Sequence, residues 1–156
     1  MTNGNGSMSP EDRKITGEAL QSALVELIGL GLQGKQAHWN IKGPNFRSVH
    51  LHLDEVVATA RKHADTIAER AAAIGMSPDG RAETIARDAK SAPFGSGSVA
   101  DTEVVNRMTQ LLGEVVARLR EGIKDTEEAD PVTQDLLISA AHKLDKHHWM
   151  FQAQKG

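Results

Sequence analysis

A short turn-forming segment between two helical stretches constrains the fold more than any other feature of the sequence. Residues 42–45, KGPN, are of the types that end helices and form turns. They separate two long stretches in which apolar residues recur at helical spacing. Ser9 and Pro10 are typical of the start of the first helix, and Gly75 is typical of the end of the second. The pattern predicts two long helices folded as an antiparallel hairpin around Pro44.

The second half of the chain predicts two further long helices. One follows Asp101, with apolar residues at spacings of three and four, and the other follows Asp130 and runs nearly to the end of the chain. Residues 81–88 predict a short helix between helices two and three. The expected fold is all-α, a four-helix bundle over residues 10–153 with a short extra helix in that connection. A disordered tail is expected at residues 1–9.

Composition excludes several classes of protein. The absence of cysteine removes disulfides, thiolate metal sites and iron–sulfur clusters. The apolar runs are far shorter than the ~20 residues of a membrane span, and residues 1–9 lack the apolar core of a signal peptide. We therefore expect a cytoplasmic protein without membrane contact. The net charge of −3 argues against unaided nucleic-acid binding, because such proteins usually carry a basic stripe.

The second predicted helix carries four residues of metal-ligand type on one face. His50 and Asp54 are separated by four residues, as are Asp65 and Glu69, so each pair spans about one helical turn. Asp54 and Asp65 are 11 residues apart, close to three whole turns, which places both pairs on one stripe. The two pairs are nevertheless about 16 Å apart along the helix axis. One chain alone cannot bring all four residues to a single ion.

A second copy of the helix resolves this separation. The midpoint of 50 and 69 and the midpoint of 54 and 65 are both 59.5. An antiparallel copy related by a two-fold axis at this point places His50 opposite Glu69 and Asp54 opposite Asp65. The hairpin around Pro44 sets His38 level with His50. The stripe therefore predicts two identical sites, each built from two chains, with imidazole and carboxylate ligands that suit Fe(II), Mn(II) or Zn(II).

Several nearby residues have more than one interpretation. His50, Asp54 and the other stripe residues can each be merely structural or solvated, since acidic residues at this spacing usually face water. His63 lies near the edge of the stripe and is a possible outer ligand. Trp39 follows His38 and is either a core-packing residue or a ring that a redox metal can oxidise.

These segments closely resemble the Dps family, the ferritin-like mini-ferritins. The resemblance covers about residues 10–153 and is most specific in the stretch 35–75. The matching residues are HWN at 38–40, GPNF at 43–46, His50, Asp54, DTIAER at 65–70, DLL at 135–137, LDK at 144–146 and WM at 149–150. The spacing of the two histidines and three acids is the most specific part of this match.

The resemblance implies a ferritin-like bundle that assembles into a hollow homododecamer. Family members are ferroxidases that oxidise Fe(II), preferably with hydrogen peroxide, at centres between two-fold-related subunits, and they store ferric mineral. By residue-for-residue match, the catalytic and iron-binding residues are His38, His50, Asp54, Asp65 and Glu69. Consuming iron and peroxide together protects DNA and the cell from oxidative damage. Acidic pores admit iron in this family, and Asp130 and Asp135 are candidates for them; Asp130 is also explained as a helix cap.

Direct DNA binding is expected to be weak. Many family members bind DNA through basic termini, but no Lys or Arg precedes Arg13 here, and the C-terminus offers only Lys155. Several positive charges are needed to neutralise phosphates. We expect little binding near neutral pH, with nucleoid association only if DNA is bound.

Three other interpretations compete with a ferroxidase shell. An ordinary ferritin or bacterioferritin carries Glu-x-x-His on two helices; this chain has none, and Asp145 with His148 is the nearest pattern. The scarcity of Lys and Arg in the N-terminal tail counts against a nucleoid-packing protein without enzymatic activity. A plain oligomeric bundle with zinc in a structural site uses the same ligand types.

Overall fold

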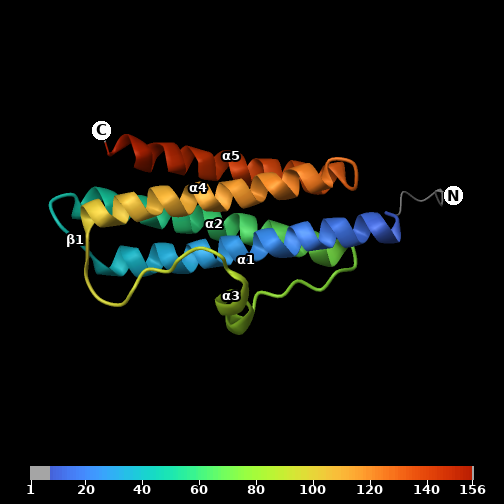
Figure 1. Ribbon diagram of the computed structural model, residues 1–156, viewed down its shortest axis with the longest axis horizontal. Coiled ribbons are helices and arrows are strands. Elements are labelled where there is room, and N and C mark those ends of the chain that lie inside the picture. Colours follow the sequence, from blue (N-terminus) through green and yellow to red (C-terminus); the bar gives the residue numbers. More distant parts are fainter. Residues whose placement is uncertain (1–7, 156) are drawn as a thin grey trace.

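The long helices lie side by side along one axis in the computed structural model, which describes residues 8–155 (Figure 1). Within these residues, the bundle consists of α1 (Pro10–Asn40), α2 (Phe46–Ala73), α4 (Asp101–Thr126) and α5 (Pro131–Ala153). A short helix, α3 (Ala82–Asp88), stands in the connection between α2 and α4. This confirms the all-α bundle predicted from the sequence. Most of the expected disordered tail, residues 1–7, lies outside the described residues.

The predicted helix starts are confirmed at two of three positions. The Ser9 side chain accepts a hydrogen bond from the backbone N of Asp12 at 3.1 Å, and Asp130 caps α5 in the same way. Asp101 was expected to cap α4, but Ala100 precedes the helix and Asp101 is its first residue. The Asp101 carboxylate instead accepts from the backbone N of Asn45 at 2.7 Å. Asp101 therefore fastens the α1–α2 turn to α4.

The connection between α2 and α4 returns along the bundle, so the chain crosses from one end to the other (Figure 1). Near its end, β2 (Val99–Ala100) pairs in parallel with β1 (Ile41–Lys42), which follows α1. This two-residue pairing was not predicted, because so short a strand leaves no periodic pattern. It fixes the position of the α1–α2 turn, and so the level at which α2 begins beside α1.

The core is aliphatic, as the low aromatic content requires. Its largest fully buried side chains are mostly leucines, with Phe151 the one ring among those in residues 8–155. Gly34 allows α1 and α2 to approach closely, since a Cβ atom there would lie 2.7 Å from Cγ2 of Val57. α1 is long and apolar enough to cross a membrane by length and composition, but 61% of its most apolar window is buried within the bundle. Packing against the other helices accounts for its apolar character.

Candidate metal centre

His38 of α1 and His50 of α2 form a stacked pair across the hairpin. Their ring centroids are 3.6 Å apart and the rings are inclined by only 11°. The Nδ1 atom of each ring lies 2.7 Å from the backbone carbonyl oxygen of the other residue. His38 is buried and His50 is half-buried. The structure thus confirms that His38 lies level with His50.

The two reciprocal hydrogen bonds determine which nitrogen of each ring is free. A carbonyl oxygen can only accept, so both Nδ1 atoms must carry the hydrogen and donate it. Each Nε2 atom then keeps its lone pair. This is the nitrogen that binds a metal ion in a histidine whose Nδ1 donates to a carbonyl. Phe46 stacks on His50 with centroids 4.7 Å apart and further holds the ring in place. The pair thus has the tautomer that a metal-binding histidine needs.

Asp54 adds a carboxylate to this pair. Its Oδ1 atom lies 3.8 Å from Nε2 of His38, on the side where the free lone pairs lie. The same oxygen forms an ion pair with Nζ of Lys35. This hydrogen bond from Lys35 is the main cause that lowers the pKa of Asp54, and the histidines add to it. Asp54 is therefore ionised at neutral pH, and the lysine ammonium supplies the positive charge beside it.

The remaining two predicted ligands lie apart from this cluster. Asp65 and Glu69 are exposed on α2, about three and four turns beyond Asp54. No group of three or more His, Asp or Glu residues suited to a metal ion is gathered anywhere in residues 8–155 of a single chain. Asp65 borders an open groove of about 470 Å³ between α1 and α2, whose other lining residues include Ile28, Leu32 and Ala68. Within the single chain, Asp54 thus lies near the His38–His50 pair, and Asp65 and Glu69 lie apart from it.

Two of the more peripheral predictions concern His63 and Trp39. His63 was placed near the edge of the stripe, but it is nine residues from Asp54, half a turn around the helix. Burial lowers the pKa of His63, and the charges of Lys62 and of Lys143 lower it further. We therefore do not retain His63 as an outer ligand. Trp39 is 70% exposed and is not a core residue of this chain.

The two pore candidates differ in their surroundings. Asp130 is buried, with its carboxylate 2.6 Å from Nη2 of Arg70 and 2.5 Å from Oγ1 of Thr133. Burial acts to raise the pKa of Asp130, but the hydrogen bonds from Thr133 and Arg70 outweigh it and the pKa is lowered. Asp130 thus caps α5 and pairs with Arg70. The helix cap was the alternative to its interpretation as a pore residue. Asp135 is exposed and remains the better pore candidate.

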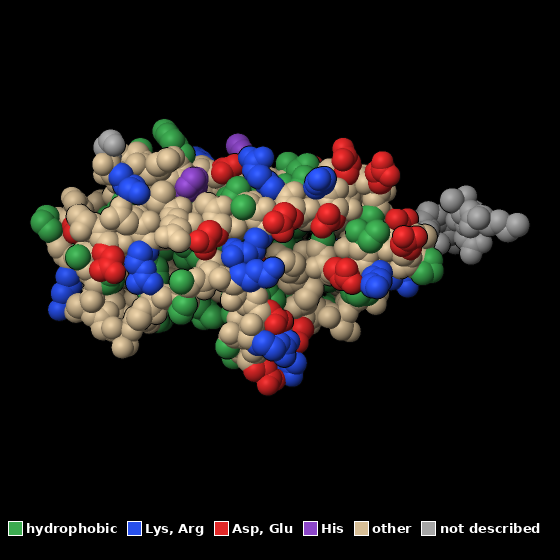
Figure 2. All heavy atoms as spheres, viewed as in Figure 1, with side chains coloured by type: hydrophobic (Ala, Val, Ile, Leu, Met, Phe, Trp, Pro, Cys, Tyr) green, Lys and Arg blue, Asp and Glu red, His purple; other side chains and the backbone are tan. Residues whose placement is uncertain are grey.

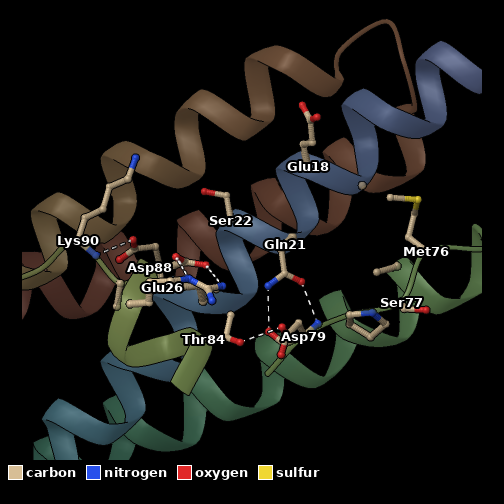
Figure 3. A pocket seen from close by; sticks show the side chains of 16 residues that line it. Glu18, Gln21, Ser22, Glu26, Met76, Ser77, Asp79, Thr84, Asp88 and Lys90 are labelled. Atoms are coloured by element: carbon tan, nitrogen blue, oxygen red, sulfur yellow. Dashed lines mark hydrogen bonds and ion pairs between the residues drawn. The ribbon is translucent and has the colours of Figure 1, made fainter. Parts of the chain in front are cut away.

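A hollow of about 960 Å³ lies between α1 and the segment from Met76 to Lys90 (Figure 3). Several of its polar side chains make hydrogen bonds across it. Gln21 exchanges two hydrogen bonds of 2.9 Å with the backbone of Asp79, and Thr84 donates to the Asp79 carboxylate. Buried Glu26 accepts from the backbone N of Lys90. These groups are engaged in holding α3 against α1, so the hollow is not the candidate site.

Sequence reasoning did not find a second histidine cluster, on the seam between α2 and α5. Nε2 of His52 lies 3.0 Å from Nδ1 of His147, whose Nε2 lies 2.9 Å from Oγ1 of Thr59. His52 also stacks on Phe151 with centroids 4.3 Å apart. Burial, followed by the charge of His52, lowers the pKa of His147 to about 4. The spacing of His52, Thr59 and His63 on one face of α2 was the available signal.

Comparisons with known proteins show which family the chain resembles. Residues 17–156 match the ferritin-like domain family. The chain is 36% identical over 143 residues to DNA protection during starvation protein 2 of Deinococcus radiodurans, covering 92% of this chain and 59% of the relative. It is 35% identical to DNA protection during starvation protein of Agrobacterium fabrum, covering 86% of this chain and 83% of the relative.

Solved structures of Dps proteins have the same fold as this chain. The structure of Dps from Microbacterium arborescens in the high iron form superposes with a TM-score of 0.89 at 32% identity, covering 94% of this chain and 95% of that one. The chain spans less than two thirds of the length of the Deinococcus relative, but nearly all of this structural neighbour. The similarity therefore covers the whole bundle and the residues of the candidate centre.

Proposed function

The chain belongs to the Dps family of ferritin-like proteins, and from this premise we propose that it oxidises Fe(II) at centres shared between two copies and stores the ferric product in a hollow shell. One observation carries the proposal. His38 and His50 are held so that both Nε2 lone pairs are free, and the Asp54 carboxylate lies 3.8 Å from Nε2 of His38. Two imidazoles and carboxylates are a ligand set that suits Fe(II).

Each proposed centre needs residues from two chains. His38, His50 and Asp54 come from one copy, and Asp65 and Glu69 come from the antiparallel α2 of the other. The shared midpoint of the two pairs supports this arrangement, as does the exposure of Asp65 and Glu69 in the single chain. A homodimer contact in which both copies use the same surface is the commonest symmetric interface. In this proposal, further contacts of other symmetry assemble the dimers into the homododecamer that the family resemblance implies.

Iron is the substrate in this proposal, and hydrogen peroxide is the oxidant. Two Fe(II) ions each give one electron, and the peroxide takes both electrons with two protons to become two waters. The chain would position the substrate iron. The fixed His38 and His50 rings and Asp54 would hold Fe(II), which would displace the Lys35 ammonium from the Asp54 carboxylate. This chemistry removes Fe(II) and peroxide together, so it limits the hydroxyl radicals that damage DNA.

Protection of DNA in this proposal is chemical rather than by direct contact. On the face shown in Figure 2, Lys and Arg side chains lie interspersed with Asp and Glu side chains and form no basic stripe. A stripe of positive charge is the usual footprint of a nucleic-acid surface. We accordingly propose a cytoplasmic protein with weak DNA binding at neutral pH. Asp135 is the proposed contributor to an iron-entry pore.

Rapid mixing of Fe(II) with peroxide tests the proposed activity. The variant H50A/D54N should lose fast Fe(II) oxidation while its shell still assembles, as measured by native mass. A matched variant, H142Q/D145N, removes a histidine and an aspartate from the exposed surface of α5 and should keep the wild-type rate. Equal rates in the two double variants would refute the site. A structural zinc site would be favoured instead by two results together. The wild-type protein would show no iron oxidation, and the H50A/D54N shell would bind less zinc than wild type.

A further inference from the structure

We propose that Arg61 is a positioning residue of the shared centre, which holds the carboxylates of two chains together while no metal ion is bound. This inference rests on the two-chain arrangement in the proposed function. Arg61 follows Asp54 by seven residues and precedes Asp65 by four, which is close to two turns and one turn of α2. Arg61 therefore lies on the stripe of predicted ligands, between these two carboxylates.

The surroundings of Arg61 leave its charge available. The side chain is exposed in the single chain and lines the groove of about 470 Å³ that Asp65 borders. A Cβ atom at Gly31 would lie 3.8 Å from Cγ of Arg61, so the aliphatic part of the side chain lies beside α1. Unlike Arg70 and Arg118, which pair with acidic residues, Arg61 makes no ion pair within residues 8–155. Its guanidinium can therefore bind a carboxylate of another chain.

The proposed two-fold axis sets Arg61 beside carboxylates of both chains. With the axis at 59.5, Arg61 lies level with position 58 of the other copy. Asp65 of its own chain and Asp54 of the other copy then meet one turn further along, about 6 Å in the direction of the helix axis. Arginine and aspartate one turn apart are within reach of each other, and the planar guanidinium carries several donors. Arg61 can therefore donate to both carboxylates together.

The charge of the metal-free centre favours such a donor. Each centre gathers three carboxylates, from Asp54 of one chain and from Asp65 and Glu69 of the other. Lys35 supplies one ammonium beside Asp54, so two negative charges are left over. Like charges repel more strongly in a contact that excludes water. Arg61 offsets one of these charges and stays protonated at neutral pH. Because a bound cation would do the same, Arg61 should matter most in the metal-free shell.

Native mass at decreasing protein concentration tests the proposal on the assembled protein, first in EDTA and then with saturating Co2+. In EDTA, R61Q should dissociate at a concentration at least about tenfold higher than wild type, because the carboxylates repel one another. Co2+ should bring R61Q to within about threefold of wild type, since the ion supplies positive charge and binds the assembled form. K146Q is the matched control, because it removes one exposed positive charge from α5, and it should match wild type in both conditions.

A second variant separates charge from packing. R61Q/D65N removes one carboxylate together with the guanidinium, so in EDTA it should assemble about tenfold more tightly than R61Q. An R61Q shell that matches K146Q in EDTA would overturn the proposal, as would a defect that persists in Co2+ or in R61Q/D65N. None of these measurements uses iron oxidation. If wild type fails to oxidise Fe(II) while R61Q shows the expected defect, the proposed activity fails and the role of Arg61 stands.

Discussion

Replacing Asp130 with alanine should destabilise the bundle strongly. The carboxylate caps α5 and accepts from Thr133, and the loss of a cap costs about 1 kcal/mol. It also pairs with Arg70 at 2.6 Å, and only 9% of the Asp130 side chain is exposed. Removing one partner of a buried pair costs about 3–5 kcal/mol, and the 24% exposure of Arg70 favours less than that range. We expect D130A to lower the free energy of unfolding by about 3 kcal/mol.

The pH dependence of this loss follows from the direction of the pKa shift. The pKa of Asp130 is lower in the folded chain than its ordinary value near 4. Its contribution is therefore fully present above that ordinary value and is lost as the pH falls through the folded value. The difference in stability between wild type and D130A should be constant from pH 6 to 8 and should shrink below about pH 4.

Urea unfolding of both proteins at one fixed concentration measures the effect, because assembly links stability to concentration. D135A is the matched control, since Asp135 is exposed on the same helix, and its loss should stay within about 0.5 kcal/mol. If D130A unfolds like D135A but takes up iron more slowly, Asp130 is a pore residue rather than a cap. That result would refute the interpretation given above.

Three further predictions address the metal face, helix packing and DNA. K35Q should bind Zn2+ about two- to fivefold more tightly in calorimetry, because Lys35 competes with the ion for Asp54; tighter binding by wild type would contradict this. G34A should destabilise wild type by up to about 2 kcal/mol, because crowding against Val57 exceeds the gain in helix propensity. In the V57A background, where this crowding is absent, G34A should stabilise the protein. The same sign of the effect in both backgrounds would refute the packing argument. In a low-salt gel shift at neutral pH the shell should retard DNA little, and tight binding at physiological salt would disprove this.

Much of the fold could be predicted because its signals are local. Apolar spacing, Ser9, the 42–45 break and Asp130-Pro131 identified the helices within a few residues. The level of His38 and His50 followed from the hairpin alone. The β1–β2 pairing and the role of Asp101 at the α1–α2 turn could not be predicted, because both depend on contacts between residues more than 50 positions apart.

The candidate site was predictable in its residue types but not in its chemistry. Helical spacing identified His50 and Asp54. Two features could not be predicted from residue spacing, because they depend on side-chain positions. They are the reciprocal hydrogen bonds that leave both Nε2 atoms free, and the ion pair of Lys35 with Asp54. His63 lies nine residues from Asp54, which is half a turn around α2 rather than at the edge of the stripe. The His52–His147 pair joins two helices 95 positions apart, so only the structure reveals it.

The most direct test of the shared centre mixes two inactive chains. D54N and E69Q shells should each lack fast Fe(II) oxidation. In a dimer of one D54N and one E69Q chain, one centre carries both defects and the other carries neither. Random co-assembly at equal amounts should therefore restore about one quarter of the wild-type centres and of the wild-type rate. If co-assembled shells recover no activity, the two-chain centre is wrong.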